Sequence, residues 1–73
     1  MVRAVYVPAD TEAIGVTRLE VSAPTPGGGW VLTVYGLAGE PRSGTPLTAE
    51  EFRSAIREWK WAAEQGRGKV RIG

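Results

Sequence analysis

The chain has 73 residues and a formal net charge of +1, which suits one small domain and excludes a strong general attraction to nucleic acid. It contains no cysteine and no histidine, which excludes a disulfide framework, thiolate catalysis and the commonest general base. A domain of this size buries only about 60% of its unfolded surface, so its core is thin and a partner is a natural source of stability. We therefore expect residues 1–73 to form one domain, with a homodimer as the leading state.

The first half of the chain predicts two strands. Residues 2–7 are mostly β-branched and apolar, and Pro8 ends this run. Residues 9–15 predict a polar loop. Residues 16–23 alternate, which is typical of a strand with one buried face. One face carries Thr17, Leu19, Val21 and Ala23, and the other carries Arg18, Glu20 and Ser22.

A third strand follows a turn rich in proline and glycine. Residues 24–29 predict the turn, and Trp30 to Leu37 carries apolar side chains on both faces, which favours a central strand. Residues 38–47 contain two glycines and two prolines, so they predict a long loop with at most a short extended piece at residues 42–45.

Residues 48–65 predict an amphipathic helix. Thr48 and Glu51 have the spacing of a capping box, and Gly66 is a natural stop. At about 100° per residue, the apolar side chains fall in one arc about 120° wide. They are Phe52, Ala55, Ile56, Trp59, Ala62 and Ala63.

The predicted order of elements is β-β-β-α, and residues 69–72 alternate in a way that is compatible with a short terminal strand. The expected fold class is α+β, with a three- or four-stranded antiparallel meander followed by one amphipathic helix.

The sequence predicts no catalytic or metal-binding constellation. Glu50 and Glu51 are neighbours on a helix and diverge, while Asp10 and Glu12 lie in a loop where acids usually serve solvation. We expect a non-enzymatic protein without cofactor or metal. No apolar run approaches the about 18 residues of a membrane span and no signal peptide is visible, so we expect a cytoplasmic protein without a membrane partner.

The main functional signal is a large aromatic residue on the polar side of the predicted helix. Trp61 points about 180° away from Phe52, with Arg57 one turn before it and with Arg53 and Lys60 flanking the same side. Tryptophan and arginine are enriched at interface anchors, and an arginine four residues away can stack on the indole. We predict a homo-oligomer contact here. The alternative is a solvated helix face whose tryptophan packs under a loop or the C-terminal tail.

The C-terminal tail is a candidate for contact with phosphates. Arg67, Lys69 and Arg71 stand together without an acidic residue. Three such charges give weak, salt-dependent binding without specificity. The alternative, which we favour slightly, is a surface strand with Val70 and Ile72 pointing inward.

Three aromatic side chains on the predicted strands have two interpretations. Tyr6, Trp30 and Tyr35 can stack single-stranded bases or fill the thin core. Core packing is the favoured interpretation for all three.

The helix also carries an apolar-Arg-x-x-apolar-Arg-x-Trp pattern, formed by Phe52, Arg53, Ile56, Arg57 and Trp59. With the order of elements and the basic tail, this pattern resembles the N-terminal oligomerisation half of the actinobacterial H-NS-like nucleoid-bridging silencer family. That resemblance implies dimerisation and assembly rather than DNA reading, which belongs to a separate half of those proteins. In element order alone, the chain is similar to positive-cofactor-four type coactivators, whose dimers bind single-stranded DNA.

These observations favour a small self-associating module that acts through protein–protein contacts in a nucleic-acid or transcription setting. Trp61, Arg57 and Arg53 are its predicted contact residues. One alternative is a dimeric single-stranded nucleic-acid-binding protein, and another is a small inhibitor or accessory subunit of a larger protein partner.

Overall fold

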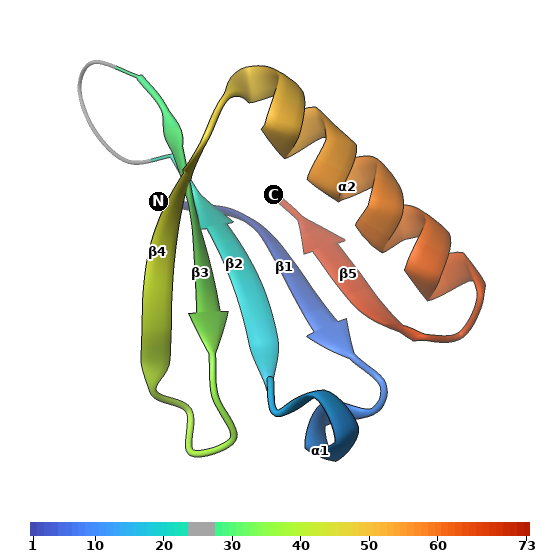
Figure 1. The fold of residues 1–73 in the computed structure, drawn as a ribbon. Coiled ribbons are helices and arrows are strands. Elements are labelled where there is room, and N and C mark those ends of the chain that lie inside the picture. Colours follow the sequence, from blue (N-terminus) through green and yellow to red (C-terminus); the bar gives the residue numbers. More distant parts are fainter. Residues whose placement is uncertain (24–27) are drawn as a thin grey trace.

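The computed structural model describes residues 1–23 and 28–73, without the side chain of Ser43, and shows one antiparallel sheet with one main helix (Figure 1). In chain order the elements are β1 (Val2–Pro8), α1 (Thr11–Ile14), β2 (Arg18–Ser22), β3 (Trp30–Tyr35), β4 (Pro41–Leu47), α2 (Ala49–Glu64) and β5 (Gly68–Ile72). The predicted turn at residues 24–29 lies largely outside the described residues.

The sheet has five strands in the spatial order β4-β3-β2-β1-β5, and every neighbouring pair is antiparallel. The first four strands form a meander, and β5 returns after α2 to pair with the free side of β1. The α+β class, the antiparallel sheet and the single main helix are therefore confirmed. The expectation of three or four strands is wrong, because both the region before the helix and the tail contribute a strand.

The extra strand is β4, which occupies most of the segment predicted as a loop. Its residues pair with β3 from Trp30↔Leu47 to Tyr35↔Pro41. The strand lies at the edge of the sheet, where proline is tolerated because one side of the backbone needs no ladder partner. Pro41 and Pro46 therefore end no strand here, although they are strong loop signals in the sequence.

The polar loop predicted at residues 9–15 contains the short helix α1. The Ala13 N–H donates to Asp10 Oδ1 at 3.3 Å, which caps the first turn. Gly15 ends the helix at φ 71°, a left-handed conformation that glycine adopts without steric cost.

The ends of α2 are those predicted from its sequence. Thr48 accepts a hydrogen bond from the Glu51 N–H at 3.1 Å, and Glu51 Oε1 accepts one from the Thr48 N–H at 2.8 Å. This capping box is therefore confirmed. At the other end, the Arg67 N–H donates to the Ala62 carbonyl at 2.9 Å as the chain turns back toward β5.

The core lies between α2 and one face of the sheet. The buried residues of this core are Ala4, Val21 and Trp59, and Pro8 is buried at the end of β1. The partly buried apolar residues packed against the core residues are Tyr6, Leu19, Trp30, Leu32, Leu47, Phe52, Ala55, Ile56 and Val70. The predicted apolar arc of the helix and the predicted inward face of β2 are thus confirmed. The terminal strand is also confirmed, with Val70 packed against the core.

We predict that Thr48→Ala lowers the free energy of unfolding by about 1 kcal/mol, because it removes the hydroxyl that accepts from the Glu51 N–H. Chemical denaturation measures this change. Thr45→Ala, at an exposed position of β4, is the control and should cost clearly less. Equal losses for the two variants would show that the capping box does not stabilise α2.

Candidate functional site

The largest uncovered feature of the molecule is the second face of the sheet. Ala4 and Tyr6 point toward α2, so Val5 and Val7, the alternate residues of β1, point to the opposite side. No described element packs over that opposite face, which we call the open face. Val2 also lies on this face, opposite Ser22, because the register of β1 with β2 shifts between Val2 and Ala4. Val7 is 40% exposed and Val2 is 44% exposed, which is high for β-branched residues in a sheet.

The register brings charged and apolar side chains of the open face into one row. Val5 is opposite Glu20 on one side and opposite Arg71 on the other. Glu20 in turn is opposite Thr33 on β3. A shallow groove of about 540 Å³ runs along this region, between the β1 valines and the cationic side chains of β5. Its lining residues are Val2, Val5, Val7, Glu20, Lys69, Val70 and Arg71.

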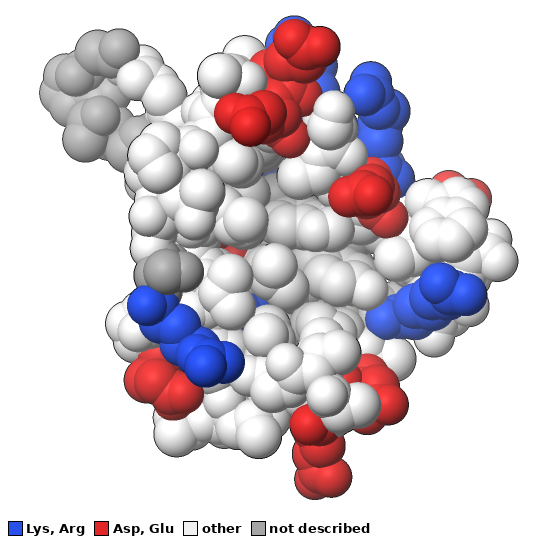
Figure 2. Space-filling model, viewed as in Figure 1, with Lys and Arg blue, Asp and Glu red and all other residues white. Residues whose placement is uncertain are grey.

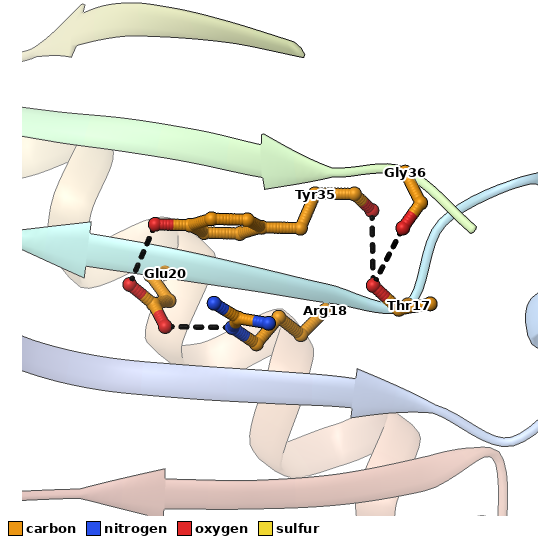
Figure 3. Close-up of polar contacts among 5 residues, drawn as sticks. All are labelled: Thr17, Arg18, Glu20, Tyr35 and Gly36. Atoms are coloured by element: carbon orange, nitrogen blue, oxygen red, sulfur yellow. Dashed lines mark hydrogen bonds and ion pairs between the residues drawn. The ribbon is translucent and has the colours of Figure 1, made fainter. Parts of the chain in front are cut away.

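A polar cluster occupies the adjoining part of the open face (Figure 3). Arg18 Nε donates to Glu20 Oε2 at 2.7 Å, and the Tyr35 hydroxyl donates to Glu20 Oε1 at 3.2 Å. The Arg18 guanidinium also lies over the Tyr35 ring, with Cζ 3.7 Å from the centroid. Arg18 and Tyr35 are directly opposite each other in the ladder of β2 and β3, so the register of these strands brings the two side chains into contact.

The Glu20 carboxylate, through its hydrogen bond, raises the pKa of the Arg18 guanidinium above its ordinary value. A cation whose pKa is raised on folding contributes its stabilisation below its unfolded pKa and loses it only as pH rises through the folded pKa. The Arg18 charge is therefore constant across the physiological range.

Trp61 lies on the outer side of α2 and is 54% exposed. The cation over its ring is Arg67, with Cζ 5.4 Å from the centroid, and not the predicted Arg57. Arg57 Nη2 instead donates to Ser54 Oγ at 3.2 Å. The prediction of an Arg57–Trp61 stack is therefore wrong, because the chain reversal after α2 brings a tail arginine closer to the indole.

The other three predicted helix residues line one groove together. Arg53, Arg57 and Lys60 form the rim of a hollow of about 290 Å³ between α2 and the end of β5. Phe52, Ile56 and Ile72 provide its apolar lining, and Ile72 is 47% exposed. Trp61 does not line this groove, so the structure does not unite the four predicted residues into one site.

The basic tail divides between two surfaces. The Arg67 carbonyl accepts from the Tyr6 hydroxyl and the Ala9 N–H, both at 2.9 Å, which fixes the chain where its side chain reaches Trp61. Lys69 and Arg71 follow on β5 and border the groove of the open face. The tail therefore forms a surface strand and no detached arm.

The three strand aromatics also separate. Tyr6 stacks on Trp59 with centroids 5.6 Å apart, and Trp30 stacks on Phe52 at 4.1 Å, so both are used in packing under α2. Core packing is thus confirmed for these two. It is wrong for Tyr35, whose ring lies on the open face beneath Arg18.

Charge is mixed on the face seen in Figure 2. Acidic side chains gather at the top of the view and at the opposite end of the molecule, and Lys and Arg side chains are seen beside them at the top and singly at the right and lower left. Within residues 1–23 and 28–73, no group of three or more His, Cys, Asp or Glu residues is placed to hold a metal ion. No helix in the described part of the chain has the length and apolar character needed to cross a membrane.

Comparisons with protein-family models, curated proteins and solved structures found no match. The resemblance to the nucleoid-bridging silencer family stays a prediction.

We predict that the two helix tryptophans differ strongly in their contribution to stability. Trp59→Ala should lower the free energy of unfolding by about 3 kcal/mol or more, because it empties the buried site stacked on Tyr6. Trp61→Ala should cost about 1 kcal/mol or less, the scale of an exposed cation–π contact. Denaturant titration gives both values, and a Trp61 loss comparable to that of Trp59 would show that Trp61 is a packing residue.

We also predict that Tyr35→Phe destabilises the chain by about 1 kcal/mol, because it removes the hydroxyl that donates to Glu20 and keeps the ring under Arg18. Tyr35→Leu, which removes the ring as well, should cost more. Thermal or chemical unfolding of the pair separates the hydrogen bond from the stack. If both variants unfold like the parent chain, the cluster contributes nothing to the fold.

Proposed function

We propose that this protein is a small self-associating module in which two copies pack through their open sheet faces. The observation that carries the proposal is the exposure of β1 valines in the inner part of a sheet that α2 covers on one side only. An α/β layer with an apolar second face gains stability when that face is covered.

The row through Val5 gives the second copy a definite orientation. Glu20 and Arg71 lie on opposite sides of Val5 and at the same level. Two copies whose open faces meet can be related by a two-fold axis that lies between them and runs parallel to β1. The two β1 strands then lie over each other, and Glu20 of one copy lies opposite Arg71 of the other. An axis across the strands would instead bring Glu20 close to its own counterpart. At the level of Val5, charge complementarity therefore favours the first arrangement; at the level of Val7 the same axis sets Lys69 near Arg18, whose charge Glu20 of its own copy already pairs.

The dimensions of the molecule suit such a contact. The two longer extents are 36 and 26 Å, and the third is 17 Å. A broad face of that size is of the order of the about 800 Å² per partner that standard protein interfaces use. Packing through this face would also supply the second apolar layer that a thin core lacks.

The sequence also predicts self-association, but it predicts a contact surface on the helix and not on the open face. Trp61 and the groove residues Arg53, Arg57 and Lys60 lie on α2, away from the open face. The nucleic-acid alternative loses two of its three stacking candidates, since Tyr6 and Trp30 are packed beneath α2. The family resemblance also implies self-association.

The proposal predicts a dimer whose dissociation constant rises at least about tenfold, or about 1.4 kcal/mol, in Val7→Arg. The substitution sets a charge against the facing β1 strand, where it has no partner. Sedimentation equilibrium over a wide concentration range measures the effect. Leu37→Arg makes the same change at a 55% exposed position outside the face, and its dimer should match that of the parent chain.

Trp61→Ala separates the two candidate interfaces in the same experiment. A dimer that survives Trp61→Ala and dissociates in Val7→Arg supports the open face. A dimer lost in Trp61→Ala and kept in Val7→Arg places the contact on α2 instead. A parent chain that stays monomeric at about 1 mM, far above the dissociation constants of specific interfaces, contradicts self-association altogether.

A further inference from the structure

The outer edge of β5 is the second unsatisfied surface of this fold. The Ala9 N–H donates to the Arg67 carbonyl and the Gly73 N–H to the Arg3 carbonyl, at 2.9 and 3.0 Å. In an antiparallel ladder every second residue forms hydrogen bonds with the neighbouring strand. Arg67 and Gly73 bond toward the β1 side, so Lys69 and Arg71 between them also direct their N–H and C=O groups toward β1. Gly68, Val70 and Ile72 therefore direct their N–H and C=O groups to the outer edge, beside which no described strand lies.

The two edges of the sheet are not equivalent as pairing sites. Pro41 and Pro46 interrupt the donor series of β4, whereas β5 contains no proline. A further strand can therefore continue the ladder at β5 in a way that it cannot at β4.

Basic side chains border the β5 edge on both faces. Lys69 and Arg71 are exposed on the open face. On the α2 side, Arg53, Arg57 and Lys60 line the groove that ends at Ile72, and no acidic residue is among its lining residues. The single ion pair within the described residues, Arg18–Glu20, lies elsewhere. The nearest acids on the same side of α2 by helical position are Glu50 and Glu64.

These charges exclude a second copy as the natural occupant of this edge. Two β5 strands paired antiparallel about Val70 would bring Lys69 opposite Arg71, and like charges directly opposite destabilise a ladder. The other strands of this chain offer no better partner, because Glu20 is their only acidic residue within the described segments.

We propose that the β5 edge, together with the groove beneath α2, binds an extended acidic segment of another protein by strand addition. Lys69 and Arg71 are two residues apart, so acids at alternate positions of the added strand lie beside them. The residues between those acids face α2, where an apolar side chain enters the groove among Phe52, Ile56 and Ile72. The recognised pattern is acid–apolar–acid–apolar. Binding of this segment does not require the self-association proposed above, and Arg71 is the residue that the two proposals share.

The test uses the full chain and three synthetic heptapeptides. One alternates glutamate with valine, the second has the same composition with the glutamates and valines in separate blocks, and the third alternates lysine with valine. In about 20 mM salt, where surface charges are weakly screened, the first should bind more tightly than the others. Its binding should slow amide exchange at Gly68, Val70 and Ile72 while leaving Lys69 and Arg71 unchanged, since their amides already bond β1.

Charge reversal at the groove provides the matched variants. Arg57→Glu should weaken binding of the alternating acidic peptide about three- to tenfold, while Arg42→Glu, the same change on β4, should alter it less than about twofold. Arg57 lies off the open face, so its variant should retain the dimer. Absence of binding at about 1 mM peptide, equal binding of the lysine peptide, or binding without protection of the three edge amides would each overturn the proposal.

Discussion

A single helix covers a single face of this sheet, and the rest of the molecule follows from that constraint. α2 has 16 residues, so it is about 24 Å long and about 10 Å wide, while five strands span roughly 19 Å between the outer two. Two aromatic stacks hold the helix in place, Phe52 on Trp30 near its start and Trp59 on Tyr6 near its end. The three buried residues of the core cluster, Ala4, Val21 and Trp59, all belong to this one interface. The opposite face and the flanks of the helix are left to solvent or to partners.

The two edge strands of the sheet, β4 and β5, limit pairing with further strands in different ways. β4 is protected by Pro41 and Pro46, which remove donors from its ladder. β5 is protected by Lys69 and Arg71, which repel a second β5 strand but attract an acidic one. Proline blocks every strand, whereas charge blocks only strands of the same sign. An edge defended by charge alone therefore remains open to a partner of the opposite charge.

The sequence predicts the local features of this fold much better than its long-range ones. The capping box of Thr48 and Glu51, the apolar arc of α2 and the inward face of β2 all depend on spacings of two to four residues. β4 is missed because proline and glycine carry the same local signal in a loop and in an edge strand. Tyr35 is misassigned because the ring pairs with Arg18 across the ladder, and its face depends on a register that the sequence does not state. The Arg67–Trp61 contact likewise requires the chain reversal after α2.

Net charge hides the electrostatic character of this protein. A net charge of +1 predicts little attraction to charged partners. Seen from one side, the surface of the molecule carries side chains of both signs (Figure 2). Yet the fold places the α2 cations Arg53, Arg57 and Lys60 beside Ile72 at the end of β5, while Lys69 and Arg71 lie along the other face of the same strand. At physiological salt a charge acts over about 8 Å, so a ligand experiences this local cluster and not the sum over the chain. Of the four acids of α2, Glu51 and Glu58 lie on another side by helical position, while Glu50 and Glu64 bound the cations at the two ends of the helix. Selectivity for an acidic strand is therefore compatible with a nearly neutral chain.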